Sequence, residues 1–341
     1  MSYHTSLTSR AVSNWLLVVA IMVIAMIIVG GTTRLTDSGL SITEWKPISG
    51  AIPPLTQSDW EEEFRLYQRT TEFQEQNSAM TLAEFELIFW WEWGHRQLGR
   101  LIGLVFFIPL VFFWLKGRLS ARLKPRLLVL LLMGGSQGAI GWWMVASGLV
   151  DRLDVSQYRL ATHLGMAFII LGYSIWLSLE ARFGPPPLRR GTLTGISFGL
   201  LALVFLQIIL GAFVAGLDAG RIYNTWPLMN GDLIPEGYLA GMNFFPAIFE
   251  SHAAVQMHHR WTGYLVALAV AAYAAKIWFE PRVSLKPFMV ILPALVIAQI
   301  GLGIAALLAV VPLSLSLLHQ FGAVLLFIAT LCAAWTARRS V

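Results

Sequence analysis

The sequence predicts an all-α membrane protein whose eight transmembrane helices form two four-helix bundles related by a pseudo-two-fold axis. Three observations lead to this prediction: little charge, eight long apolar runs, and motifs in the second half that repeat those of the first. Of the 341 residues, 57% are hydrophobic and 13% are charged, whereas a soluble domain carries about 25% charged residues. Such a composition is typical of a chain that crosses a bilayer several times.

Each apolar run is long enough for one helical crossing of the membrane, which takes about 20 residues. The first run follows a short polar N-terminus and is not followed by a small-residue cleavage site, so we expect a retained helix. The expected spans are 13–31, 87–115, 127–147, 158–180, 195–215, 252–279, 287–310 and 314–336.

Basic residues fall on alternate loops between these spans, and this pattern predicts the orientation. The formal net charge of +5 comes mostly from short loops, so we interpret it as a topology signal and expect no nucleic-acid partner. By the positive-inside rule, both termini lie in the cytoplasm. The residues on that side are Arg10, Lys116, Arg118, Arg122, Lys124, Arg126, Arg182, Arg189, Arg190, Arg282, Lys286, Arg338 and Arg339.

The chain is expected to divide into an N-terminal half, residues 1–184, and a C-terminal half, residues 185–341. A proline-rich link, ARFGPPPLRR, joins them as a cytoplasmic hinge. The opposite side carries two long loops, about 32–86 and 216–251. The first contains an acidic, polar stretch that predicts a short amphipathic helix outside the membrane.

Matching motifs show that the two halves repeat. In the outer loops, Asp37 aligns with Asp218 and Trp45 with Trp226 at a common offset. HRQLGR in the second span matches HRWTGY in the sixth, and Gln137 in the third span aligns with Gln299 in the seventh. Both halves begin on the same side, so we expect parallel repeats about an axis along the membrane normal.

Four histidines occupy equivalent positions in these repeats: His95, His163, His259 and His319. A single histidine in a span is usually a packing or hydrogen-bonding residue, but four at one depth favour a function. Two facing histidines of a helical bundle can ligate a haem iron from opposite faces. The pattern therefore predicts one bis-histidine haem site per half, lying side by side near the outer surface, which is unlike the stacked haems of transmembrane electron carriers.

Three arginines lie beside these histidines: Arg96, Arg100 and Arg260. Haem propionates near the membrane boundary need cationic partners, and arginine suits a carboxylate well. The same residues would also be explained by snorkelling of their side chains to the interface. They are therefore candidates for propionate binding or support.

One carboxylate breaks the symmetry of the halves. Glu92 lies one turn before His95, whereas Gln256 holds the equivalent position in the second half. A carboxylate beside a haem can transfer a proton or stabilise a developing positive charge; alternatively, it is a solvated residue near the helix start. We therefore expect Glu92 to be catalytic, with chemistry in the first half and a permanent cofactor in the second.

The eight spans, the four histidines, the stretch GTTRLTDSGLS, TEWKP and the ExxHR motif at 92–96 resemble the haem A synthase family over nearly the whole chain. The resemblance implies an oxidoreductase for cytochrome oxidase biogenesis, which oxidises the C8 methyl of haem O to a formyl group by successive hydroxylations. It implies haem O as substrate, haem A as product and haem b as cofactor. The positions that match are the substrate ligands His95 and His163, the haem b ligands His259 and His319, and the catalytic Glu92.

Some members of that family carry a cysteine pair in the outer loops, whereas this chain has only Cys332 in its last span, which excludes a disulfide relay. The short N-terminus favours a bacterial inner membrane, with the haem sites toward the periplasm. Beside the bilayer and haem O, a haem O synthase and an electron acceptor of unknown kind are expected partners. The oxygen source and the oligomeric state stay open, a homo-oligomer included.

Two other functions remain open from the residues alone. A non-catalytic bis-histidine haem carrier or electron-transfer protein would use the same ligands. A transporter would explain the duplication, but the spans lack the paired broken helices that transporters have at mid-membrane.

Overall fold

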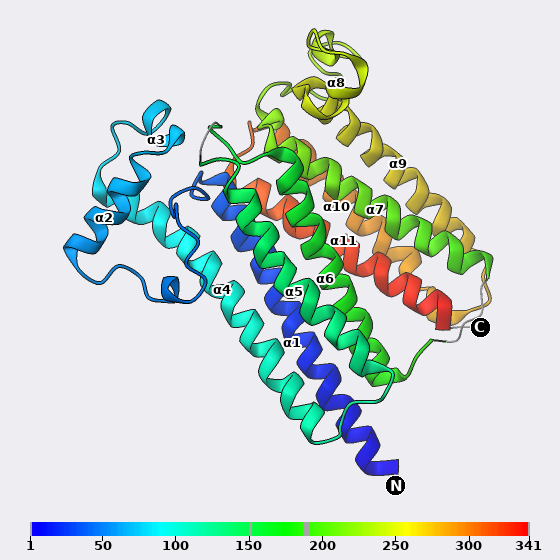
Figure 1. The fold of residues 1–341 in the computed structure, drawn as a ribbon. Coiled ribbons are helices and arrows are strands. Elements are labelled where there is room, and N and C mark those ends of the chain that lie inside the picture. The colour runs from blue at the N-terminus through cyan, green and yellow to red at the C-terminus, as the bar shows by residue number, and fades with distance from the viewer. Residues whose placement is uncertain (1, 150–151, 187–190, 340–341) are drawn as a thin grey trace. The chain divides into compact units, whose positions relative to one another are not determined.

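The computed structural model describes residues 2–149, 152–186 and 191–339, and side chains from residue 10 onward. Within these ranges it contains helices and no strand, and eight of the helices are long and apolar enough to cross a membrane (Figure 1). The predicted helical class and number of spans are therefore confirmed. Residues 187–190 of the proline-rich link, predicted to be a hinge, lie outside the described ranges.

The helices fall into two compact units, Met1–Arg182 and Phe183–Val341. The helices that begin in the first unit are α1 (Ser2–Leu35), α2 (Gln57–Tyr67), α3 (Thr71–Glu75), α4 (Leu82–Leu115), α5 (Leu123–Val145) and α6 (Gln157–Phe183). Those in the second unit are α7 (Thr192–Gly216), α8 (Phe244–Glu250), α9 (His252–Trp278), α10 (Phe288–Leu308) and α11 (Leu313–Arg339).

The long outer loop of the first unit contains the predicted amphipathic helix, which is α2, followed by the short α3. The Thr56 side chain accepts a hydrogen bond from the Asp59 amide and forms a capping box that starts α2. Tyr67, Phe85 and Phe89 bury their rings together with Ile42. This small core fastens α2 and α3 to the first turns of α4 (Figure 1).

Helix α4 begins five residues before the predicted start of its span. Thr81 caps it, and the Glu84 carboxylate accepts from the Thr81 amide at 2.8 Å in a second capping box. The apolar run marks only the part of the helix that suits lipid, whereas the cap marks where the helix begins. The extra turns support the outer loop.

Polar contacts join the remaining helices of the first unit. The Ser13 and Ser178 hydroxyls lie 3.0 Å apart and link α1 to α6. The buried Glu180 carboxylate of α6 pairs with Arg122, just before α5, and with Arg126 inside it. Because a buried charge is costly unless paired, this cluster fixes the contact of α5 with α6.

In the second unit α7 packs against α9 and α11, and α10 packs against the same two helices. The Ser197 and Tyr273 hydroxyls lie 2.7 Å apart between α7 and α9. The Thr194 hydroxyl donates to the Ala337 carbonyl at 3.2 Å between α7 and α11. Four helices thus enclose a common interior.

Helices α1 and α7 end in the same way. Asp37 and Asp218, which the repeat aligns, have φ angles of 49° and 48°. This left-handed conformation is uncommon outside glycine but accessible to aspartate. It turns the chain out of each helix and directs the outer loop back over the same unit.

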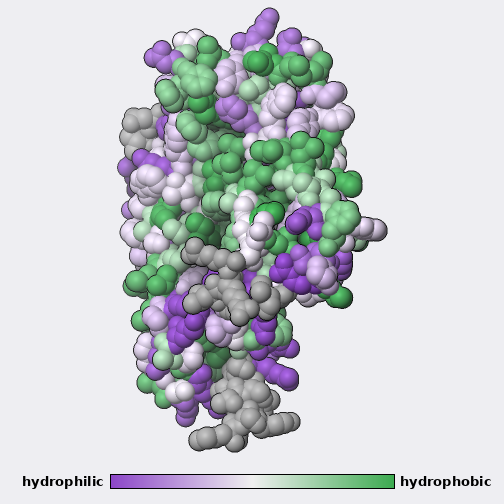
Figure 2. Space-filling view, turned by 90° about the vertical axis from the view of Figure 1, so that its right-hand side faces the viewer, coloured by the Kyte–Doolittle hydropathy of each residue, from purple (hydrophilic) through white to green (hydrophobic). Residues whose placement is uncertain are grey.

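Apolar side chains face outward along the spans, as expected for contact with lipid. Leu128, Val129 and Leu132 of α5 are examples that are exposed. Figure 2 shows many hydrophobic residues on the face that it draws. Such an apolar exterior suits a protein whose surroundings are hydrocarbon.

Candidate functional site

Each of the four predicted ligand histidines rests against a glycine on another helix of its own unit. A Cβ atom added to any of these glycines would lie only 2.8–3.1 Å from the imidazole. Real Cβ atoms rarely approach so closely, so the ring positions depend on these bare backbone sites. The pairs are Gly30 with His95, Gly141 with His163, Gly211 with His259, and Gly303 with His319.

Three of these histidines also share a second contact. A glutamine one turn before the glycine donates from Nε2 to the backbone carbonyl of the histidine at 2.9 Å. The donor and acceptor pairs are Gln137 with His163, Gln207 with His259, and Gln299 with His319. At the fourth position, opposite His95, the chain has Met26.

The rings of His259 and His319 face one another within the second unit. Their centroids are 6.3 Å apart and their planes are inclined by 80°. One metal ion, bonded to a nitrogen of each ring at about 2.0–2.1 Å, would fit between them. The His319 Nδ1 lies 3.1 Å from the Gln299 carbonyl; if Nδ1 donates there, the Nε2 lone pair is left for a metal.

The donor set fits a haem better than a bare ion. Among the described residues, no group of three or more His, Cys, Asp or Glu side chains could hold a metal. A pair of histidines is nevertheless sufficient for haem iron, because the porphyrin supplies the remaining nitrogen ligands. The residues present therefore fit the axial ligation of one haem between α9 and α11.

The first unit brings its own pair together. His95 and His163 are close enough to interact electrostatically, and both are shielded from solvent in part. The His163 Nδ1 is buried and lacks a hydrogen-bond partner. This pair therefore has a weaker set of supporting contacts than the pair on α9 and α11.

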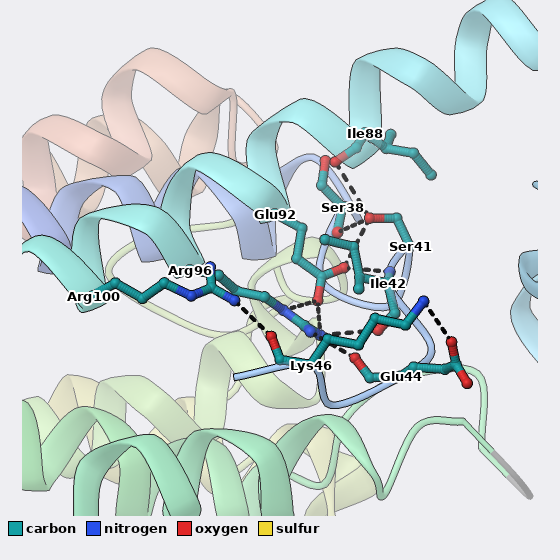
Figure 3. Close-up of polar contacts among 9 residues, drawn as sticks. All are labelled: Ser38, Ser41, Ile42, Glu44, Lys46, Ile88, Glu92, Arg96 and Arg100. Atoms are coloured by element: carbon teal, nitrogen blue, oxygen red, sulfur yellow. Dashed lines mark hydrogen bonds and ion pairs between the residues drawn. The ribbon is translucent and has the colours of Figure 1, made fainter. Parts of the chain in front are cut away.

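Glu92 is buried in a network with the outer loop, and this contradicts the alternative that it is solvated. Only 2% of its surface is exposed. Its Oε2 accepts from the Ser41 hydroxyl and from the Ile42 amide, each at 2.8 Å. Its Oε1 accepts from Arg96 Nη2 at 2.6 Å (Figure 3). These hydrogen bonds and the adjacent guanidinium hold both oxygens of the carboxylate in place.

Arg96 and Arg260 hold their outer loops by equivalent contacts. Each guanidinium donates to two loop carbonyls that the repeat aligns, at distances of 2.7–3.0 Å. The acceptors are Ile42 and Glu44 for Arg96, and Tyr223 and Thr225 for Arg260. Arg100 donates to the Lys46 carbonyl (Figure 3) and to the Pro47 carbonyl. These arginines support the loops; propionate binding by them stays a prediction.

Gln256 mirrors the position of Glu92 with the opposite polarity. Its Nε2 donates to the Ala219 carbonyl at 2.9 Å, and its Oε1 accepts from Arg260 at 3.1 Å. The loop of the first unit offers a hydroxyl and an amide N–H at this place, whereas the loop of the second unit offers a carbonyl. Each loop therefore matches the residue it covers.

A stacked tryptophan pair lies beside this network in the first unit. The Trp142 and Trp45 rings stack with centroids 5.9 Å apart, and the Arg96 guanidinium lies 5.8 Å from the Trp142 ring. Ile304 occupies the position in α10 that the repeat aligns with Trp142. The surroundings of the two histidine pairs thus differ in more than Glu92.

The sequence indicated the histidines, Glu92 and the arginines, but it missed the residues that hold them in place. These are the four glycines, Gln207 and Ser41. A signal was present: Gly30 aligns with Gly211 and Gly141 with Gly303 in the same register as the other repeat positions. Gln207 was hidden because its counterpart is a methionine.

Comparison with known proteins places the chain in a family. The family described as cytochrome oxidase assembly protein matches residues 13–331. The chain belongs to this family. It is 83% identical to the heme A synthase of Maricaulis maris (strain MCS10) over the full length of both proteins. It is 49% identical to that of Parvibaculum lavamentivorans, over 95% of this chain and 93% of the relative, and 48% identical to that of Caulobacter sp. (strain K31), over 99% of each. The predicted resemblance to haem A synthases is confirmed.

Proposed function

We propose that this protein is an oxidoreductase that converts haem O to haem A by oxidising the C8 methyl to a formyl group, for cytochrome oxidase assembly. Its full-length similarity to heme A synthases supports the reaction. One observation carries the assignment to a site: of the two histidine pairs, only the pair at His95 and His163 has a buried carboxylate, Glu92, one turn from a ligand.

In this proposal the substrate haem lies between His95 and His163. The two imidazoles ligate its iron, and the apolar helix faces around them receive the macrocycle. The outer loop, held by Arg96, covers this side of the helices. The loop therefore helps to keep bulk water from the reacting methyl group.

Glu92 acts on charge. Loss of one proton and two electrons from the methyl group, with the electrons passing to the electron acceptor, leaves positive charge at its carbon, and a carboxylate fixed in place stabilises such charge without reorganising. Ser41 and the Ile42 amide hold Oε2 in position. If a water molecule took the place of one of these donors, the same oxygen could accept a proton from that water as it attacks the methyl carbon.

The second pair, His259 and His319, holds haem b as a resident cofactor. When bound, that haem supplies one-electron redox chemistry. The Gln299 carbonyl fixes the tautomer of His319 and Gln207 braces His259. These contacts suit a ligand set that stays loaded through many turnovers.

We further propose that the halves are parallel repeats in a bacterial inner membrane, with cytoplasmic termini and periplasmic haem sites. Basic residues beside the short loops support this orientation. A haem O synthase that hands over substrate, and an electron acceptor, complete the set of expected partners.

Pigment analysis tests the function. Haems are extracted from membranes of a host that makes haem O, with and without this chain, and separated by chromatography. Haem A should appear only with the chain. A non-catalytic haem carrier would instead leave the haem composition unchanged, and that result would refute the proposal.

A further inference from the structure

In both pairs each histidine ring lies against a glycine. The pairs differ in the glutamine that donates to the histidine carbonyl, which both histidines of the second pair have. Gln207 of α7 donates to the His259 carbonyl at 2.9 Å, and the same Nε2 lies 3.2 Å from His259 Nδ1. Met26 of α1 holds the equivalent place opposite His95. Methionine has no hydrogen-bond donor, so residue 26 cannot donate to the His95 carbonyl as Gln207 donates to the His259 carbonyl.

Position 26 and position 207 contact the same part of the neighbouring helix. The Met26 methyl group lies 3.4 Å from where a Cβ of Gly99 would be, and the Gln207 amide lies 3.3 Å from where a Cβ of Gly263 would be. Gly99 and Gly263 each follow a ligand histidine by one turn. The two side chains therefore fill the same space and differ in what they offer chemically.

Each of these glutamines has a buried polar atom whose burial is unfavourable, and packing does not explain why a glutamine is present. The Oε1 atoms of Gln137, Gln207 and Gln299 are buried without a hydrogen-bond partner. An unsatisfied acceptor in an apolar interior is unfavourable, and methionine would fill the space without it. The compensating interaction is the bond from Nε2 to the histidine carbonyl, which fixes the helix that carries the ligand.

We propose that residues 26 and 207 determine how firmly each half retains haem. Gln207 is a positioning residue that clamps the backbone of His259 for a resident haem, and Met26 leaves His95 free to shift so that substrate enters and product leaves. This inference rests on the proposed assignment of the two sites. Contacts that orient a ligating histidine typically change metal affinity by about 10–100-fold.

Reciprocal variants of the full-length protein test the proposal. Gln207→Met should accelerate transfer of the resident haem b to added apomyoglobin by about 10-fold or more, followed by absorbance. Met26→Gln should slow the release of added haem O to apomyoglobin by a similar factor. Met26→Leu, which keeps the side chain apolar, should release haem O at the rate of the parent protein.

A general loss of stability would speed haem release in both variants. Faster release from Gln207→Met together with slower release from Met26→Gln would therefore not be explained by it. Parent-like haem b transfer by Gln207→Met, or equal effects of Met26→Gln and Met26→Leu, would overturn the inference. If Gln207→Met aggregates on size exclusion, the two Met26 variants decide alone.

A separate variant keeps this outcome distinct from failure of the proposed function. His319→Ala should lose the resident haem b. If His319→Ala keeps it, the assignment of that pair is wrong whatever residue 207 does. If His319→Ala loses haem while Gln207→Met behaves as the parent, only the inference about position 207 falls.

Discussion

Glu92 and Gln256 occupy equivalent positions, yet the groups that surround them differ in hydrogen-bonding polarity. Glu92 receives three kinds of donor: a hydroxyl, a backbone amide and a guanidinium. Gln256 must donate to the Ala219 carbonyl. A residue exchange at either site therefore leaves one polar contact mismatched in a buried place, which is costly.

Replacement of Glu92 by glutamine tests its role in the reaction. Glu92→Gln should still bind haem, but haem O should persist or a hydroxylated intermediate accumulate, with conversion reduced about 10²-fold or more because the carboxylate is lost. Chromatography of extracted haems measures this. Ser41→Ala removes one donor but keeps the carboxylate, so it should lower conversion less than Glu92→Gln does. Full conversion by Glu92→Gln would contradict the role.

Glu72 predicts a pH-dependent stability of the outer segment. Burial, and then the negative charge of Asp37, raise the pKa of its carboxyl from 4.5 to about 8. A raised pKa means that the fold favours the protonated acid, so this contribution to stability is complete below about pH 4.5 and is lost as the pH rises through about 8. The protection factors of amides in α2 and α3, which are exchange rates corrected for base catalysis, should therefore fall between about pH 4.5 and about pH 8.

The control for this pH effect lies on the same short helix. Glu72→Gln should remove most of the pH dependence of these protection factors, because the amide does not titrate. Glu75→Gln changes an exposed carboxyl and should leave the dependence as it is. A pH dependence that persists in Glu72→Gln would show that another group is responsible.

At the scale of helices, the close approach of α10 to α11 depends on glycines, of which Gly303 faces a candidate ligand. A Cβ on Gly303 would lie 2.8 Å from His319 Cε1, whereas a Cβ on Gly301, half a turn away, would meet no atom within 4 Å. Helix pairs in membranes often approach through small residues. Here the small residue also sets the position of a candidate ligand.

Substitution of these two glycines separates the effect of the contact with His319 from the effect of a glycine change on the helix itself. Gly303→Ala should displace the His319 ring and lower haem b occupancy of the purified protein by about 10-fold, read from the absorbance of the haem relative to protein. Gly301→Ala should keep full occupancy, because a Cβ there meets no atom within 4 Å. Both changes have the same effect on helix propensity, so a difference between them reports the contact with His319. Equal haem b occupancy in the two variants would mean that the contact of Gly303 with His319 does not determine haem binding.

The helices show how far sequence reasoning reaches. Span number followed from composition because a bilayer demands long apolar helices. The start of α4 did not, because the capping box at Thr81 lies outside the apolar run. Among site residues, the histidines and Glu92 stood out as polar groups in apolar segments. Gln207 did not, because its contact depends on how α7 packs against α9, and its repeat partner is a methionine.

For the whole molecule, the distribution of basic loops predicts an orientation that labelling can test. In a Cys332→Ser background, a cysteine at Ser58 in α2 should react with a membrane-impermeant maleimide added to spheroplasts. A cysteine at Ala121, between α4 and α5, should react only after permeabilisation. Both positions are exposed, so accessibility of the side chain is matched. The reverse pattern would place the histidine pairs on the cytoplasmic side.

The arginine clamp that both halves share has a consequence for the history of the chain. Because Arg96 and Arg260 close equivalent loops on equivalent carbonyls, an ancestral duplication would have produced two closed halves before they differed in chemistry. Glutamate and glutamine codons differ at their first base, so a single nucleotide change separates Glu92 from Gln256 at that position. One nucleotide change thus suffices to exchange these two residues, while the task of each half also depends on the other positions at which the halves differ, such as Met26 and Gln207.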